Sequence, residues 1–332
     1  MSTVKSNPFQ RNRLIRDAIG RAIYEAMQRD SSIYLFGEGA EIKQHYDAPQ
    51  IEKEFPHRVI TLPISEDANT NFAVGASLLG VKPVVDCITS DFMYRAMDSI
   101  CNSAAKLNFV AAEGQPPKTI VIRGEFLMGG PTTGQRPEAL FCHIPDLNVV
   151  LPSIPRDAYG LMRTALAMPG VTIFFEDRMI LDSEISTVEM MSVFPEERLP
   201  IPFGFLRHCT HPTSAQVTVV TYGLMRQVVE GLVWEHDFLK TVDLLDLRTL
   251  YPIDWPALSA SVAMTGKLLI IEPDIKYGGI GAEIAAVIAE HDPGVRIKRL
   301  GAPRETIPAN PARHGEMLPS RERVLEAIRG MI

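Results

Sequence analysis

A carboxylate that follows a predicted strand is the residue of this sequence best placed for chemistry. The run 59–62 is short, apolar and β-branched, which is typical of a buried strand, and Pro63 ends it because proline cannot donate to a β-ladder. Glu66 comes directly afterwards. Ligands of open parallel sheets bind at the carboxyl ends of the strands, so we expect Glu66 to contact a ligand. The alternative is an ordinary acid in the first turn of the next helix.

Glu38 and His143 are the next candidates, since both lie beside predicted strands. Glu38 follows the apolar run 33–36, although a solvated loop carboxylate would fit there as well. His143 lies in a loop that enters the predicted strand 147–151, where a lone histidine can also be purely structural. An imidazole with an unperturbed pKa of about 6.5 suits proton transfer in either direction.

Phe92 and Arg95 lie near the start of a predicted helix, 91–107, whose apolar residues recur every four positions. Phe92 could belong to the core or stack against a planar ligand. Arg95 could be a solvated helix charge or could recognise a carboxylate or phosphate on a substrate.

Strands and helices alternate through the first half of the chain, which predicts a parallel sheet covered on both faces. The predicted strands are 33–36, 59–62, 119–122, 147–151 and 171–175, and the predicted helices are 14–30, 69–79, 91–107 and 156–167. Prolines 195, 200, 202 and 212 indicate a linker, and a second alternating unit follows it. We therefore predict an α/β protein with two doubly wound domains, 1–190 and 213–332, joined by residues 191–212.

Two glycine-rich stretches are predicted to be irregular. Residues 123–135 hold four glycines and a proline, which favours a flexible loop of the kind that closes over active sites. Residues 278–281 could approach a dinucleotide phosphate, but Ile284 occupies the third position of that fingerprint. A tight connection between strand and helix is the interpretation we favour for residues 278–281.

Composition excludes several classes of protein. The chain has 332 residues, 46% hydrophobic and 22% charged, and a net charge of −7 without basic runs, which argues against a nucleic-acid surface. Its four cysteines have no zinc-finger or disulfide spacing, so we predict neither a metal site nor disulfides. The sequence has no apolar run of membrane-spanning length and no signal-peptide core, so we expect a cytoplasmic protein.

An ordered set of short motifs resembles the beta subunit of thiamine-diphosphate-dependent 2-oxo acid dehydrogenases, members of the transketolase-like superfamily. The likeness spans about residues 12–330. It is carried by Ile64-Ser65-Glu66, Ala73 to Ala76, Lys82-Pro83-Val84, Asp91-Phe92, Asp98, residues 102–106, His143, residues 146–152, Phe175-Glu176, residues 246–250 with Pro252 and Asp254, and residues 281–286.

The resemblance assigns roles to the candidates. Glu66 matches the acid that hydrogen-bonds N1′ of the cofactor's aminopyrimidine and favours its imino tautomer, and Phe92 matches an aromatic residue that packs on this ring. Glu38 matches an acid near the subunit interface, which places it beside the cofactor. His143 matches a histidine in the active-site funnel that takes part in proton and acyl transfer.

A missing motif implies a partner. Thiamine enzymes hold the diphosphate and a divalent metal through Gly-Asp-Gly, and this sequence contains none. The resemblance therefore implies an alpha subunit that binds the diphosphate and Mg²⁺, an alpha-two beta-two heterotetramer and an active site between chains. A lipoyl acyltransferase would receive the acyl group.

Departures from the family leave alternatives open. Asp67-Ala68-Asn69 makes the surroundings of the pyrimidine more polar, Thr133-Gly134-Gln135 replaces a common His-Ser-Gln, and Met168 replaces an acid that helps a monovalent cation in some members. Arg95 in the pattern Phe-x-x-Arg-Ala resembles deoxyxylulose-phosphate synthases. The alternatives are therefore transfer of the carbanion to an aldehyde or ketone with formation of a carbon–carbon bond, and a non-catalytic scaffold subunit.

Overall fold

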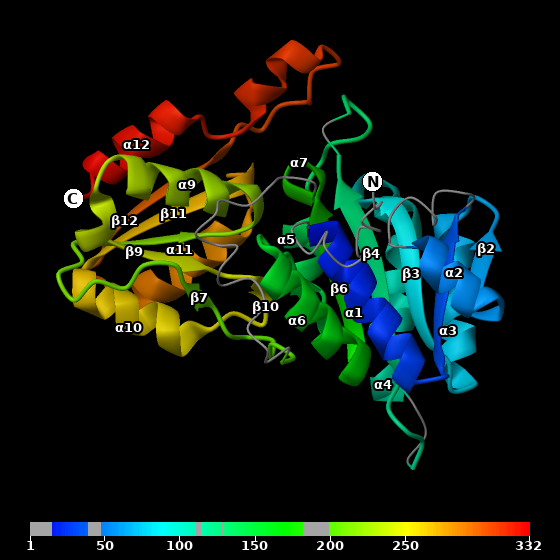
Figure 1. The fold of residues 1–332 in the computed structure, drawn as a ribbon. Coiled ribbons are helices and arrows are strands. Elements are labelled where there is room, and N and C mark those ends of the chain that lie inside the picture. The colour runs from blue at the N-terminus through cyan, green and yellow to red at the C-terminus, as the bar shows by residue number, and fades with distance from the viewer. Residues whose placement is uncertain (1–14, 39–47, 111–113, 128, 182–198) are drawn as a thin grey trace, which may run out of the picture.

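The computed structural model describes residues 15–38, 48–110, 114–127, 129–181 and 199–332. Each half of this chain forms a sheet covered by helices on both faces (Figure 1). The two doubly wound α/β units predicted from the alternation are confirmed. Among the described helices, none is long and apolar enough to cross a bilayer.

The first sheet has seven strands in the order β10-β5-β6-β4-β3-β1-β2, and all pair in parallel except β10. Its strands are β1 (Ile33–Glu38), β2 (Val59–Leu62), β3 (Lys82–Thr89), β4 (Thr119–Phe126), β5 (Leu147–Val150), β6 (Gly170–Asp177) and β10 (Thr249–Tyr251). The carboxyl ends of β1 and β2 therefore lie side by side, with Glu38 opposite Leu62.

Alternate side chains of the first sheet enter two apolar layers, because successive residues of a strand point to opposite faces. One layer lies against α1 (Ile15–Arg29) and α6 (Pro155–Ala167), which cross the front of the sheet together in Figure 1. The other lies against α3 (Glu66–Leu78) and the helical segments that follow β3. The shorter helices of this half are α2 (Ala48–Glu54), Pro56–Arg58, α4 (Leu107–Val110), α5 (Glu138–Cys142) and α7 (Arg178–Leu181).

The second sheet has five strands in the order β12-β11-β8-β9-β7. They are β7 (Arg207–His208), β8 (Val217–Thr221), β9 (Val242–Asp246), β11 (Lys267–Ile275) and β12 (Arg296–Ala302). Helices α9 and α12 cover one face, and α10 and α11 cover the other (Figure 1). The helices of this half are α9 (Gly223–Glu235), Phe238–Lys240, α10 (Trp255–Thr265), α11 (Ile280–His291), Pro311–Met317 and α12 (Arg321–Arg329).

Strand β10 joins the two halves, since it follows β9 in the chain but pairs with β5 of the first sheet. The preceding Arg248 is mostly buried, and its guanidinium donates to Asp157 of α6 and to the Phe205 and Leu206 carbonyls. Part of the predicted linker, residues 191–198, lies outside the described residues, and Arg207 and His208 at its other end already form β7.

Three local predictions were wrong. Strand β2 is not buried but half-exposed, because it is the edge strand of its sheet. The predicted helix 91–107 begins as a 3₁₀ segment, Ser90–Ala96, and continues as a π-helical segment, Ser99–Ala104, in which Ser99 hydrogen-bonds Asp67 of α3. The predicted flexible loop 123–135 starts too early, since residues 123–126 complete the buried strand β4.

Candidate active site

Glu38 and Glu66 come together at the carboxyl ends of β1 and β2. Both carboxylates are shielded from water, with Glu38 2% exposed and Glu66 9% exposed. Oε1 of Glu38 accepts hydrogen bonds from the Ser65 amide at 2.9 Å and from Nδ2 of Asn69 at 3.0 Å. Burial raises the pKa of Glu38, and the negative charge of Glu66 adds to this shift.

The first turn of α3 fixes the position of Glu66, but its carboxylate has no hydrogen-bond partner among the described residues. The side chain of Thr70 hydrogen-bonds the Glu66 carbonyl, which fixes the first turn of α3. The Glu66 carboxyl oxygens themselves take no hydrogen bond from the described residues. The side chain is mostly covered but its oxygens still reach the surface, so this group can hydrogen-bond a ligand or another chain. Asn69, which fixes the neighbouring Glu38, was missed because its role depends on a side chain 31 positions away.

Phe92 and Arg95 lie on the 3₁₀ segment that packs against α3. The ring of Phe92 is 36% exposed, so the alternative of a plain core residue is wrong. Arg95 is exposed and forms no ion pair with the parts of the chain that the structure describes. Both side chains are therefore free to contact a ligand.

Asp91, which the sequence did not single out as a site residue by itself, anchors the glycine-rich loop to this segment. Its buried carboxylate accepts hydrogen bonds at 2.9 Å from the amides of Gly134 and Gln135. Burial raises the pKa of Asp91, and these two amide donors oppose the shift. The loop is thereby held beside Phe92.

A buried ion network supports the sheet behind Glu38. Arg123 of β4 is almost fully buried and contacts Glu176 of β6, with Nε to Oε1 at 2.6 Å, and Asp86 of β3 at 3.4 Å. The negative charge of Asp86 in turn helps to raise the pKa of Glu38. Acids inside apolar strands were the only signal of this network in the sequence.

His143 lies in a different place from the two acids. It directly follows α5 and precedes the amino end of β5, whereas Glu38 and Glu66 follow carboxyl ends. Its exposed side chain lines a cavity of about 790 Å³ between the two halves, together with Tyr251 and Gly279. None of Glu38, Glu66 and Phe92 lines this cavity.

The glycine-rich turn before α11 packs against a buried carboxylate of the same chain. The amide of Gly281 donates to Oε1 of the buried Glu272 at 2.7 Å, so the start of this helix is occupied by a carboxylate of the same chain. A Cβ atom at Gly279 would lie 2.6 Å from the same carboxyl oxygen. The tight strand-to-helix connection that we favoured is confirmed.

Comparisons with known proteins match both halves. The pyrimidine-binding domain family of transketolase matches residues 12–183, and the C-terminal domain family of transketolase matches residues 210–324. The pyruvate dehydrogenase E1 component subunit beta of Rickettsia felis is 33% identical over 82% of this chain and 83% of its own. The 2-oxoisovalerate dehydrogenase subunit beta of Bacillus subtilis is 32% identical over 89% of this chain and 90% of its own.

One solved structure extends the likeness to the whole fold. A split-gene transketolase, described as an inactive beta4 tetramer, superposes with a TM-score of 0.77 and covers 96% of this chain and 97% of its own. Its sequence identity is 20%, so this comparison speaks for the fold alone.

Proposed function

This chain belongs to the family of beta subunits of thiamine-diphosphate-dependent 2-oxo acid dehydrogenases, and from this membership we propose that it decarboxylates a 2-oxo acid together with an alpha subunit. The reaction class is that of an oxidoreductase, and the acyl group would pass to a lipoyl carrier. One observation of the site carries the proposal. Glu66 is mostly buried and lies at the carboxyl edge of a parallel sheet, and its carboxylate takes no hydrogen bond from the part of the chain that the structure describes.

The residues present fit half of thiamine diphosphate. When bound, the cofactor supplies the ring carbon that attacks the oxo acid. Glu66 would hold N1′ of the aminopyrimidine by a hydrogen bond, and the partly exposed Phe92 ring would pack against it, worth about 0.5–1.5 kcal/mol beyond burial. Glu38 would keep Glu66 in a confined, weakly hydrated setting, since the two charges already affect each other.

An alpha subunit would complete the site. The chain lacks Gly-Asp-Gly, so we propose that the partner binds the diphosphate and Mg²⁺ in an alpha-two beta-two heterotetramer. Apolar side chains are uncovered at both ends of α3 on the described surface: Ile64, two residues before Glu66, is 80% exposed, and Leu79, which follows the other end of the helix, is 88% exposed. Large exposed apolar groups of this kind are typical of a surface that another chain covers.

His143 and Arg95 have proposed roles that reach beyond the pyrimidine. His143 would take part in proton and acyl transfer, and its cavity between the two halves could admit part of a lipoyl arm. Arg95 would bind a carboxylate or phosphate on the substrate, because its guanidinium is exposed near Phe92. A His143→Ala variant that transfers acyl groups at the wild-type rate would remove that residue from the mechanism.

The decisive experiment substitutes Glu66. Glu66→Gln in the reconstituted pair should lower 2-oxo acid turnover by about 10²–10⁴-fold, the usual contribution of a positioned proton-transfer group. Glu326→Gln on the exposed face of α12 is the matched control and should keep full activity. Assembly is checked by size-exclusion chromatography. Unchanged turnover of an assembled Glu66→Gln complex would favour the scaffold alternative.

Carbon–carbon ligation is the second candidate, because the exposed Arg95, which pairs with no acid of the described residues, offers a cation to a phosphorylated or carboxylated acceptor. Assays with a lipoyl domain and with small aldehydes or ketones, each with Arg95→Ala alongside, distinguish the two acceptors. We propose the cytoplasm as the compartment, which the four free cysteines support.

A further inference from the structure

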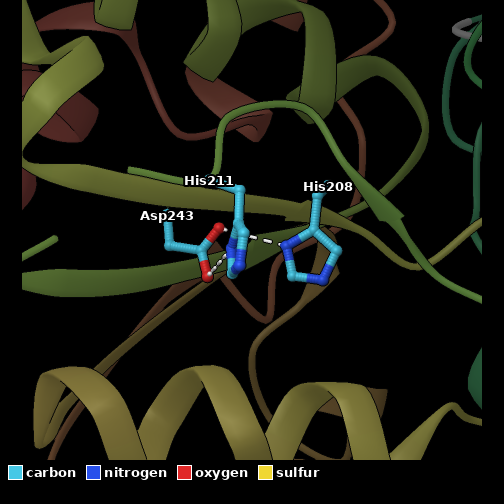
Figure 2. Close-up of side chains that lie close together, drawn as sticks. All are labelled: His208, His211 and Asp243. Atoms are coloured by element: carbon cyan, nitrogen blue, oxygen red, sulfur yellow. Dashed lines mark hydrogen bonds and ion pairs between the residues drawn. The ribbon is translucent and has the colours of Figure 1, made fainter. Parts of the chain in front are cut away.

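Two histidines and an aspartate of the second sheet meet in an arrangement that the proposed chemistry does not use. His208 ends β7, His211 follows three residues later, and Asp243 lies within β9. Nδ1 of His208 lies 3.2 Å from Oδ1 of Asp243, and Nδ1 of His211 lies 3.2 Å from Oδ2 (Figure 2). We propose that these three side chains bind a divalent transition-metal ion, with zinc as the first candidate.

The donor set and its spacing suit such an ion. One donor atom from each of the three residues lies within 4.8 Å of the others. Each imidazole Nδ1 lies 3.2 Å from a different oxygen of Asp243, and zinc binds imidazole nitrogen and carboxylate oxygen with bonds of about 2.0–2.2 Å. Two imidazoles with one carboxylate are typical of zinc and its first-row neighbours, whereas calcium and magnesium prefer oxygen donors.

Asp243 places a carboxylate in the interior of the second sheet, where a cation would balance its charge. Its side chain is completely buried, and within the described residues the two imidazoles are the only groups beside it that could carry a positive charge. Ser261 donates a further hydrogen bond at 2.6 Å but is neutral. A divalent ion held by the same three side chains would supply the positive charge that balances this buried carboxylate.

The surrounding residues hold the three donors in place. Thr210 lies between the histidines, donates to the Val242 carbonyl at 2.7 Å and accepts from the Leu244 amide at 2.9 Å, so it fixes the segment across Asp243. On the other side, Ser261 also contacts Thr218 at 2.7 Å. Hydrogen bonds to ligand residues of this kind orient them and raise metal affinity.

The site is open on one side and bordered by the junction of the two halves. The side chain of His211 is 60% exposed, which leaves an entry path and a coordination position for water. Strand β7 has only two residues, and Arg207 beside His208 lies 3.8 Å from Asp157 of α6, which also binds Arg248. A bound ion would hold this short edge strand on β9 and thereby brace the junction.

The test measures zinc on the tag-free, full-length chain after treatment with a chelator. Isothermal titration and elemental analysis should give one zinc ion per chain, and cobalt should give the visible absorption bands of a four-coordinate site. Zinc should also raise the melting temperature. Mg²⁺ at the same concentration should neither bind to this site nor raise the melting temperature. That result would distinguish this site from the site of the Mg²⁺ that accompanies the proposed cofactor.

His211→Ala and Asp243→Asn are the informative variants. His211 is exposed and can be removed without opening the core, and Asp243→Asn keeps the size of the buried group. Each should weaken zinc binding by at least about tenfold, in line with the loss of a ligand or an outer-shell partner. His291→Ala, an exposed histidine at the end of α11, should bind zinc like the wild type. No saturable zinc binding, or binding that survives both variants, would overturn the proposal.

Discussion

Each of the two sheets contains a deeply buried carboxylate, Glu38 in the first and Asp243 in the second. The two carboxylates have different partners, which suit them to different ligands. Glu38 lies at the end of β1, where its partners are a neutral amide and Asn69, and a second acid lies nearby. Asp243 lies inside β9, where its partners are two imidazoles and a hydroxyl. The first setting favours a proton, and the second favours a cation. The partners around each acid thus decide which ligand it is suited to.

The largest effect on stability should come from removing Arg123, the cation that pairs with two buried acids in the first sheet. Arg123→Met removes the guanidinium that pairs with the buried Asp86 and Glu176, so the free energy of unfolding should fall by about 3–5 kcal/mol. Urea denaturation measures it. Arg323→Met on the exposed face of α12 is the control and should change stability by less than about 0.5 kcal/mol. A small loss at Arg123 would contradict the view that this cation is the main counter-charge of the two acids.

A smaller loss of stability is expected from removing Asn69, a neutral donor that hydrogen-bonds the buried Glu38. Asn69→Ala removes the 3.0 Å hydrogen bond to Glu38 and should cost about 1–3 kcal/mol, since the buried acceptor stays behind. Asn69→Asp should be worse, because it adds a third acid beside Glu38 and Glu66. Thermal and urea denaturation of both variants test this order, and equal stability of the two would show that charge is not what limits this cluster.

The pH dependence of stability should show whether the buried Glu38 favours its protonated form. Burial raises the pKa of Glu38 in the native state, so its contribution is complete below the unfolded pKa of about 4.3 and is lost as pH rises through the native pKa. Glu38→Gln should therefore gain stability relative to the wild type from pH 4 to pH 8. Denaturation curves across this range measure it, and a constant difference would contradict it.

The smallest effect on stability is expected for a substitution at the proposed metal site of the second sheet when no metal is bound. His211→Ala should change the stability of the metal-free chain by no more than about 1 kcal/mol, because His211 is 60% exposed and the buried Asp243 keeps its contacts with His208 and Ser261. In zinc, the same variant should show a smaller zinc-dependent gain in melting temperature than the wild type. A large loss without zinc would make His211 a structural partner of Asp243 and nothing more.

Local patterns predicted much of the first sheet. The apolar runs 33–36 and 171–175 both became strands, and the stop at Pro63 correctly placed Glu66 after a strand. The amphipathic helix that begins near residue 15 and the helix of residues 156–167 were also confirmed. These features depend on neighbouring residues along the chain, which is why periodicity and proline positions reveal them.

Other features depend on strand order, which local patterns do not encode. β2 is half-exposed only because it pairs on one side, with β1. Residues 249–251 were not expected in the first sheet, and they reach it because Arg248 fixes the preceding turn between Asp157 and the Phe205 carbonyl. The 3₁₀ start at Ser90 was missed as well, since it depends on loop amides that reach Asp91 from 43 and 44 residues away.

The sequence by itself determined which residues could do chemistry and which strand ends carry them, because both are properties of short segments. Only the tertiary structure decided which of these side chains meet. Glu38 and Asn69 are 31 positions apart, and Asp243 is 35 positions from His208, so their contacts exist only once particular strands lie side by side. The histidine pair was visible as His-x-x-His, but nothing near it in the chain indicated the buried acid that gives it a possible ligand.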